Sequence, residues 1–383
     1  MKSGLNSEVF DKLAKIAGGL MNTEIDNWKK QGGKVMGYLC PVIPEELIIA
    51  AGLLPFRIRG TGSTSTSIAD AYYNDVNCDF PRHCFNQALL GKYDFLDGII
   101  ANTCCDTLLR FADNWKHAGL KTPFVYLLDN AHAAGEPMVG QFLVELNKLK
   151  GSLEKQFNVE ITEQKLWAAI KLCNETKELQ QQLYGLRKLP SPPITGAEVM
   201  AVMVAGLSMP KEQYNKDLQA LLDELAGVKA DKKYSLRLMI VGSGNDDSLL
   251  SDIIEGLGAI VVTDSTCFGA RLMAKKVAET GADPLYAIAK YQVMDVPFCP
   301  KTIGTHPQRK QFILDLAADY KVDGIVGVRF FSCDMWGAEF YMLKKDLEES
   351  GMPFIWVERE YVPDSVGQLQ TRIEAFIETI NDK

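Results

Sequence analysis

Apolar and polar positions along the chain form two similar halves, and each half predicts strands that alternate with helices. In the first half, apolar residues recur at helical spacing over residues 7–30, and a proline followed by two acids opens another helix at residues 44–51. Apolar runs of strand length lie at residues 35–40, 95–101 and 124–128. This alternation is typical of a parallel sheet, because parallel neighbours must be joined by a crossover, usually a helix.

The second half repeats the alternation after a connector. Helical spacing continues over about residues 140–186, and the proline-rich segment 189–196 (LPSPPITG) interrupts it. Four further runs of strand length follow, at residues 236–241, 259–263, 324–331 and 353–357.

The length agrees with two domains, since the chain has 383 residues and one domain usually takes roughly 100 to 200. We predict two doubly wound (Rossmann- or flavodoxin-like) α/β domains with parallel sheets. They comprise residues 1–190, which include a helical N-terminal segment, and residues 191–383. Two such domains facing each other leave a cleft at their strand ends, where open α/β sheets bind ligands.

Composition and charge exclude several functions. Hydrophobic residues make up 47% and charged residues 23%, as in ordinary globular proteins, and a net charge of -8 argues against a nucleic-acid partner. Residues 1–10 lack a basic patch followed by an apolar run, and no stretch reaches about 18 apolar residues, so we expect a soluble cytoplasmic protein without membrane contact.

Nucleotide motifs are incomplete in this chain. The turn Gly242-Ser243-Gly244 follows a strand-like run, but Asp247 stands where a dinucleotide fingerprint needs its third glycine, so we reject NAD. A contact to a CoA phosphate or a plain turn remain open there. No G-x4-G-K-S/T sequence occurs, so any ATP hydrolysis must take place on a partner protein.

Nine cysteines are the strongest chemical signal. Without a secretion signal, an odd number of cysteines indicates metal-binding or buried thiols rather than a disulfide framework. Cys105, Cys267 and Cys333 each follow a strand-like run, and soft thiolates at strand ends favour an iron–sulfur site. Cys173 lies within a helical pattern and is expected to be a packing residue.

A cluster site would have to be assembled by folding, because the cysteine spacing is not that of a local ferredoxin motif. The four histidines are too dispersed for a zinc site. His83 beside the expected cluster loop and Glu339 after Cys333 are candidate proton donors or bases. A loop histidine facing water and a glutamate on a helix surface are the alternatives.

Several ordered motifs resemble the 2-hydroxyacyl-CoA dehydratase and benzoyl-CoA reductase family, which includes double-cubane cluster proteins. The resemblance covers nearly the whole chain. Its carriers are residues 44–52 (PEELIIAAG), 70–73 (DAYY) before Cys78, 91–98 (GKYDFLDG), Cys105-Asp106 with Arg110, 184–187 (YGLR), Asp323-Gly324, Cys333-Asp334, Leu343-Lys344 and 367–372 (GQLQTR).

The resemblance implies an oxygen-sensitive [4Fe-4S] cluster held by Cys78, Cys105 and Cys333 in the inter-domain cleft. Cys104 stands where the family usually has a hydroxyl residue, and successive residues leaving a strand point in opposite directions, so Cys104 is interpreted as a packed thiol. Cys84, in a helical pattern after Cys78, is interpreted as a packing residue or a neighbour of the cluster ligands, and replacement of a proposed ligand by Cys104 or Cys84 remains open. The chain also carries further cysteines at positions that complete a six-cysteine set in double-cubane [8Fe-9S] members, namely Cys40, Cys267 and Cys299. One cluster or two per chain both remain open.

The resemblance also implies a function and partners. An ATP-hydrolysing iron–sulfur activator protein would inject single electrons, and the cluster would pass them to a CoA thioester. The result would be a ketyl-type radical, leading to dehydration of a 2-hydroxyacyl group or reduction of an aromatic ring. A homologous second subunit or a homodimer is expected. The alternatives are a homodimeric double-cubane reductase acting on small molecules and a non-catalytic electron-relay subunit.

Overall fold

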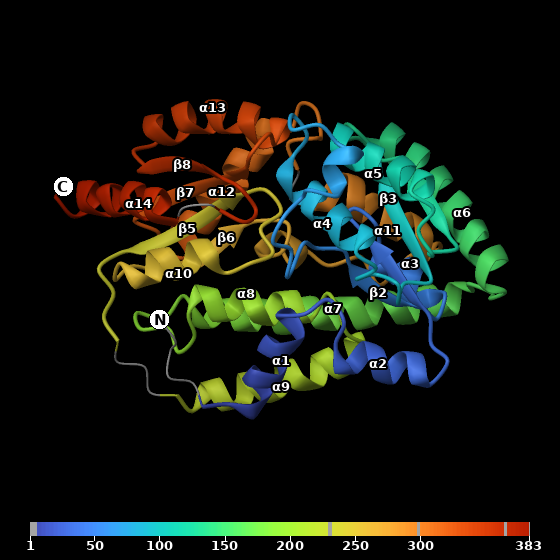
Figure 1. Cartoon of the computed structure of the whole chain (residues 1–383). Helices are drawn as coiled ribbons and strands as arrows, with labels where there is room; N and C mark the ends of the chain where they lie inside the picture. The colour runs from blue at the N-terminus through green and yellow to red at the C-terminus, as the bar shows by residue number, and fades with distance from the viewer. Residues whose placement is uncertain (1–5, 229–231, 297–298, 364–365, 383) are drawn as a thin grey trace.

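The computed structural model describes residues 6–228, 232–296, 299–363 and 366–382, and it contains two four-stranded parallel sheets (Figure 1). One sheet comprises β1 (Val35–Tyr38), β2 (Leu54–Arg57), β3 (Gly98–Asn102) and β4 (Val125–Leu128). The other comprises β5 (Arg237–Gly242), β6 (Ile260–Ser265), β7 (Gly324–Phe330) and β8 (Phe354–Arg359).

Both sheets have the same strand order relative to the chain. The first has the order β2-β1-β3-β4 and the second β6-β5-β7-β8, so in each the chain moves from an inner strand to one edge and then returns to the other side. The direction of winding therefore reverses between β1 and β3 and again between β5 and β7, which leaves a crevice at the carboxyl ends of those strands. The predicted fold class is confirmed.

Helices surround both sheets. Those of the first half are α1 (Glu8–Ala17), α2 (Thr23–Lys30), α3 (Glu45–Ala50), α4 (Asp79–Leu89), α5 (Asp106–His117), α6 (Glu136–Phe157) and α7 (Glu163–Leu186). Those of the second half are α8 (Gly196–Ala205), α9 (Lys211–Ala226), α10 (Leu249–Gly256), α11 (Pro284–Lys290), α12 (His306–Asp319), α13 (Asp334–Glu349) and α14 (Val366–Asn381). Three short helical turns complete the set, η1 (Ala69–Ala71), η2 (Ala270–Leu272) and the π-helical η3 (Tyr291–Asp295).

Two helices predicted as continuous are each divided in the structure. The segment 7–30 forms α1 and α2, because Gly18-Gly19 ends the first helix and the Asn22 side chain accepts the amides of Glu24 and Ile25 to start the second. The segment 140–186 forms α6 and α7, which are separated where Asn158 takes a left-handed backbone conformation (φ 52°). Thr162 then caps α7.

One strand escaped prediction. β2 pairs only with β1 and is therefore an edge strand, where Pro55 is tolerated although it has no amide hydrogen to donate. Its last residue, Arg57, is buried.

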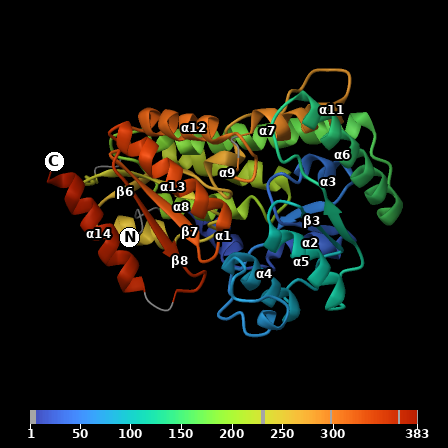
Figure 2. The same ribbon diagram turned by 90° about the horizontal axis from the view of Figure 1, so that it is seen from above.

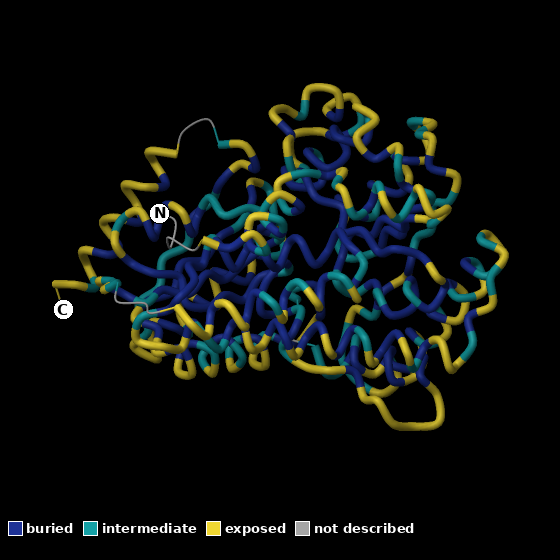
Figure 3. Tube along the Cα trace, turned by 90° about the horizontal axis from the view of Figure 1, so that it is seen from below, coloured by how far each residue is buried: buried dark blue, intermediate teal, exposed yellow. Residues whose placement is uncertain are grey.

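Segments of each half pack into the other half. α7 has 24 residues, a length of about 36 Å, and runs beneath both sheets beside α8 and α9 (Figure 1). α11 crosses from the second half to α6, where Leu285 and Ile288 share a core with Phe142 and Leu146 (Figure 2). Buried residues consequently continue from one sheet unit to the other (Figure 3). A domain boundary at residue 190 stays a prediction.

An aromatic contact joins the two sheet units directly. Phe80 of α4 stacks on Phe330 at the end of β7, with ring centroids 5.8 Å apart, and meets the edge of Phe268 at 6.2 Å. Phe80 and Phe330 both line a cavity at this junction. Within the described ranges, no helix is long and apolar enough to cross a lipid bilayer.

Candidate functional site

The crevices of the two sheets open into one shared cavity of about 210 Å³. Residues that follow β1, β3, β5, β6 and β7 all line it, so both points of winding reversal contribute. Eight of the nine cysteines line this cavity, and all nine are free thiols. The exception is Cys84, which is fully buried in the aromatic core around α4.

Cys78, Cys105 and Cys333, here named the first thiol group, occupy equivalent structural positions. Each is the N-cap residue of a helix, of α4, α5 and α13 respectively, and each precedes an aspartate. A turn with Ser332 at φ 58° brings the chain from β7 to Cys333. Three positive helix ends therefore face these sulfurs, which is an environment that favours thiolates.

Contacts within the first thiol group shift the pKa values of its members in different directions. A hydrogen bond between Cys78 and Cys333 raises the pKa of Cys78 and lowers the pKa of Cys333. Burial raises the pKa of Cys105 to about 12, although the backbone amide of Leu108 acts in the opposite direction. The structure therefore brings together the three cysteines that the family resemblance implied as ligands, and their role stays a prediction.

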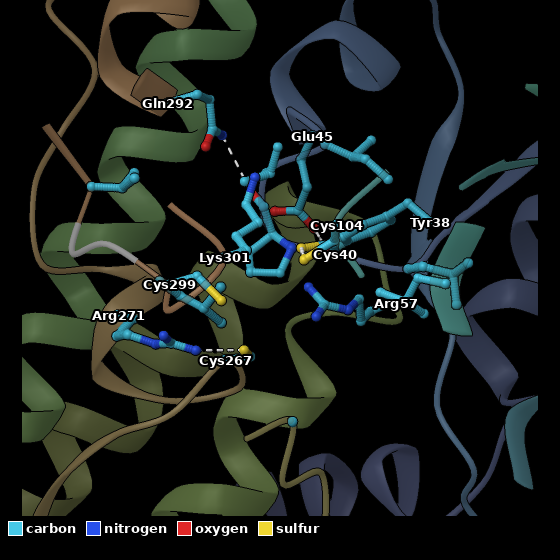
Figure 4. A pocket seen from close by; sticks show the side chains of 18 of the residues that line it. Tyr38, Cys40, Glu45, Arg57, Cys104, Cys267, Arg271, Gln292, Cys299 and Lys301 are labelled. Carbon is cyan, nitrogen blue, oxygen red and sulfur yellow. Dashed lines mark hydrogen bonds between the residues drawn. The ribbon is translucent and has the colours of Figure 1, made fainter. Parts of the chain in front are cut away.

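Four further cysteines, Cys40, Cys104, Cys267 and Cys299, form the second thiol group (Figure 4). The Sγ atoms of Cys40 and Cys104 are 3.9 Å apart, and Cys104 also forms a hydrogen bond with Cys299. These bonds raise the pKa of Cys104 and lower the pKa of Cys40 and Cys299, the latter to about 6. Residues 297–298 of the motif before Cys299 lie outside the described residues.

The second thiol group contains a residue that the sequence interpretation assigned to packing. Cys104 was expected to point away from Cys105, and it does belong to a different group from Cys105, but it lines the same cavity. Cys173 is buried in α7, as expected, and also reaches the cavity wall.

Buried cations border the second thiol group. Arg57 at the end of β2, Arg271 in η2 and Lys301 all line the cavity, and Arg271 donates a hydrogen bond to the Cys267 sulfur (Figure 4). Arg271 lies four residues after Cys267, so its proximity could have been inferred from spacing. Arg57 and Lys301 come from distant parts of the chain, and no local sequence signal indicated them.

Acid–base groups line another part of the wall. The Tyr38 hydroxyl donates to Glu45 at 2.6 Å, and the Lys211 ammonium pairs with the same carboxylate at 2.9 Å. Glu46 pairs with buried Lys177 at 3.4 Å. These carboxylates belong to the motif at residues 44–52, which supplied part of the resemblance but no candidate site residue.

The two predicted acid–base residues lie outside the lining of the cavity. His83 is buried and shares a 2.8 Å hydrogen bond with Ser63, and burial lowers its pKa. Glu339 is 2% exposed and is held by Arg309 through two hydrogen bonds and by His306. Neither residue therefore faces water as the simpler interpretation expected, and their catalytic roles stay predictions.

The glycine turn after β5 also contributes to the wall. Ser243 and Gly244 line the cavity, and the Ser243 amide donates to the Val328 carbonyl rather than into the open space. Gly242 is required because a Cβ atom there would lie 1.9 Å from that carbonyl oxygen.

The donor set fits a cluster better than a single ion. In the part of the chain that the structure describes, no three His, Cys, Asp or Glu side chains converge on a position that one metal ion could occupy. An iron–sulfur cluster makes a different demand, because each thiolate binds a different iron and the donors are distributed around it. Cysteines spread over a cavity wall meet that demand.

Comparison with known proteins gives a consistent result. A model of the family "2-hydroxyglutaryl-CoA dehydratase, D-component" matches residues 40–380. A benzoyl-CoA reductase subunit of Thauera aromatica is 30% identical over 363 residues, which cover 91% of each chain. The (R)-2-hydroxyglutaryl-CoA dehydratase beta subunit of Acidaminococcus fermentans is 26% identical over 98% of this chain and 99% of its own. The (R)-phenyllactyl-CoA dehydratase beta subunit of Clostridium sporogenes is 25% identical over 92% and 93%.

Proposed function

Because this chain belongs to the 2-hydroxyglutaryl-CoA dehydratase D-component family, we propose that it is the iron–sulfur subunit of a dehydratase or ring reductase that acts on a CoA thioester. The observation that carries the proposal is the convergence of eight free cysteines on one cavity at the carboxyl ends of two parallel sheets. A cluster bound there would supply electrons one at a time at low potential.

The residues of the chain divide the work of such a site. The first thiol group, Cys78, Cys105 and Cys333, stands at three helix N-termini and would hold the cluster, and three protein ligands would leave one iron open for substrate. The rings of Phe80 and Phe330 cover one side and exclude water from it. Elsewhere on the wall, the Tyr38 hydroxyl donates a 2.6 Å hydrogen bond to Glu45, which also pairs with Lys211, so these side chains are placed to pass a proton.

The proposal includes two partners. Because no phosphate-binding motif for ATP hydrolysis occurs in the chain, electrons come from a separate ATP-hydrolysing iron–sulfur activator. The relatives are each named as one subunit of a larger enzyme. We therefore assign this chain a homologous second subunit or a second copy of itself.

A second candidate function follows from the second thiol group. Cys40, Cys267 and Cys299 line the same cavity as the first thiol group, so a double-cubane [8Fe-9S] cluster within one chain is favoured by proximity. The cavity volume of about 210 Å³ is below the roughly 300 to 1,000 Å³ of ordinary ligand pockets. Two cubanes would fill more of this cavity than one, so the double-cubane form leaves less room for an acyl group and suits smaller substrates.

Iron and sulfide analysis of anaerobically purified protein tests both candidates. About four irons per chain support the single cluster, and about eight support the double cubane. Serine variants of Cys78, Cys105 and Cys333 should lose cluster absorbance, whereas Cys84→Ala, outside the cavity, should keep it. Protein without stoichiometric iron, or serine variants with full absorbance, would contradict the proposal. A cluster whose spectrum is indifferent to every CoA thioester would favour the relay subunit.

A further inference from the structure

Three buried cations in the cavity wall, Arg57, Arg271 and Lys301, lack carboxylate partners. Their side chains belong to residues that are only 3%, 8% and 7% exposed. Among the residues that the structure describes, none of the three forms an ion pair with an aspartate or glutamate. We name these three residues the cation trio.

Several other buried cations of the chain have an acidic partner or accept compensation from backbone carbonyls. Arg309 pairs with Glu339 at 2.6 Å, and Lys211 pairs with Glu45 at 2.9 Å. Arg59 has no acid but donates to the carbonyl oxygens of Ile16, Gly19 and Val204. At these three positions the positive charge is compensated, as burial requires.

Unpaired guanidinium nitrogens also occur on other buried arginines, such as Arg59 and Arg187, but the cation trio differs because all three residues line the cavity that the cysteines line. Nε and Nη1 of Arg57, and Nε and Nη1 of Arg271, are buried without a hydrogen-bond partner in the described ranges. The Lys301 ammonium has one bond, a 3.3 Å contact to the Ala131 carbonyl. Buried donors without a partner require an explanation, and a group bound in the cavity would supply the missing acceptors.

The cation trio surrounds the second thiol group. Arg271 donates to the Cys267 sulfur, and Figure 4 shows Arg57 and Lys301 beside the same space as Cys40, Cys104 and Cys299. The Arg57 guanidinium is fixed between aromatic rings, 4.7 Å from the centre of Phe268 and 5.4 Å from that of Tyr38. Its position is therefore set before any ligand binds.

We propose that Arg57, Arg271 and Lys301 are the counter-charges of an anionic iron–sulfur group held by the second thiol group, and that they raise its reduction potential. This inference rests on the second candidate function, because only the double-cubane form places iron at the second thiol group. Thiolate-bound clusters carry negative charge, and one-electron reduction adds another. Fixed cations beside the cluster stabilise the reduced form more than the oxidised form, which makes the midpoint potential less negative. The cation trio are positioning residues and need not touch a substrate.

Neutral and charge-retaining variants separate charge from shape. Arg57→Met and Arg271→Met remove one positive charge each while keeping an elongated side chain, and Arg57→Lys and Arg271→Lys retain the charge. Arg329→Met is the matched control, because Arg329 pairs with Glu358 outside the cavity and its loss changes the net charge of the chain equally. Each variant is purified anaerobically, assayed for iron and sulfide, and titrated with dithionite and redox mediators while paramagnetic resonance spectra are recorded.

The expected result is a more negative midpoint potential in both methionine variants, with recovery toward the wild-type value in the lysine variants and no change in Arg329→Met. If the methionine variants lose iron instead, recovery of iron in the lysine variants supports the inference, and failure to recover contradicts it. Methionine variants with wild-type iron content and an unchanged midpoint also overturn it. Wild-type protein with about four irons would support the single cluster and overturn this inference alone, whereas wild-type protein without iron would overturn the proposed function, so the two failures are distinguishable.

Discussion

Adjacent residues Cys104 and Cys105 join different thiol groups, and this division follows from backbone geometry. Cys105 is the N-cap of α5 and belongs with Cys78 and Cys333, whereas Cys104 reaches Cys40 and Cys299. Successive side chains of an extended segment point to opposite sides, so one dipeptide can supply both groups.

A cysteine variant tests whether Cys104 is more than a packing residue. We expect Cys104→Ala to lower the iron and sulfide content, because it removes the sulfur that connects Cys40 with Cys299. Cys84→Ala is the control, since Cys84 is buried in an apolar core outside the cavity. Equal iron content in both variants would return Cys104 to a packing role.

Asp246 should make stability depend on pH. Burial and the neighbouring charge of Asp247 raise the pKa of Asp246 to about 7, although its carboxyl accepts a 2.9 Å hydrogen bond from Tyr361. The unfolded chain releases this proton near pH 4, so the folded state binds it more tightly. This contribution to the free energy of unfolding is complete below about pH 4 and falls as pH rises toward 7, by an amount on the order of 4 kcal/mol.

Urea denaturation of wild type and Asp246→Asn between pH 4 and pH 8 checks this expectation. The variant should show a smaller decrease in the free energy of unfolding over that range than wild type. Asp94→Asn, at an exposed ion pair with Lys121, should keep the wild-type slope. Parallel wild-type and Asp246→Asn profiles would show that the carboxyl does not titrate there.

The sequence indicated where the cysteines gather but not which buried cations face them, because only the cysteines follow a local pattern. Cysteines after strand-like runs were informative because the carboxyl ends of parallel strands share one edge of a sheet. Arg57 and Lys301 gain meaning only from what they face after folding, and an arginine at the end of an edge strand looks like a surface residue in sequence. His83 and Glu339 show the converse, since their polar character gave no indication of their buried partners.

At the scale of elements, three helices begin at candidate ligands, so a substitution of any of these cysteines changes the start of a helix as well as the proposed site. Cys333 sits at the N-cap of α13 but completes no capping hydrogen bond with its sulfur. We expect Cys333→Ser and Cys333→Ala both to lose iron. In iron-free protein, the serine variant should be more stable than the alanine variant by about 0.5 to 2 kcal/mol, because a serine hydroxyl caps a helix well.

Chemical denaturation of the two iron-free Cys333 variants measures how much the helix cap contributes to stability. Iron analysis measures whether residue 333 is needed to bind iron. The same pair of substitutions at Cys173, in the interior of α7, is the control and should show no advantage for serine. Equal stability of the two Cys333 variants would mean that residue 333 has no role at the start of α13.

Replacement of glycine by alanine should have opposite effects on stability at two positions. Gly242→Ala should destabilise the protein by at least about 3 kcal/mol, because the new methyl group would lie 1.9 Å from the Val328 carbonyl in the neighbouring strand. Gly140→Ala, in α6 with nothing within 4 Å of the added Cβ, should stabilise it by roughly 0.5 to 1 kcal/mol. Thermal unfolding of both variants under anaerobic conditions checks the signs, and a tolerated Gly242→Ala would contradict the tight β5–β7 contact.

Elements were predictable where one local pattern decided them. The strands carry continuous apolar runs because both faces of each sheet are covered, and these runs were recognised at seven of the eight strands. The breaks at Gly18-Gly19 and Asn158 were missed because apolar spacing continues across them. β2 was missed because its proline indicates a strand only once the edge position is known.

On the scale of the whole molecule, the cavity is a property of both halves. α11 enters the first half, α7 supports both sheets, and the Phe80 and Phe330 rings stack across the junction. The halves are therefore expected to unfold together. The predicted division at residue 190 marks a connector between helices. No sequence pattern could indicate that α11 packs against the first half, because the apolar face of α11 does not specify which helix it contacts.

The cation trio leads to a last prediction, which concerns the stability of the whole protein with and without its cluster. In iron-free protein the cation trio has no carboxylate to face, so Arg57→Met should remove an uncompensated buried charge and raise the free energy of unfolding by about 1 to 4 kcal/mol. In the iron-loaded protein the same change removes a counter-charge and should lower stability. Denaturant titrations of wild type and Arg57→Met should therefore give opposite orders of stability in the iron-loaded protein and after anaerobic chelation.

The control is Arg329→Met, which should change the free energy of unfolding equally in both forms, because its partner Glu358 remains whether or not the cavity is filled. An Arg57→Met variant that is destabilised equally in both forms would show that Arg57 contributes through packing between Tyr38 and Phe268 rather than through charge.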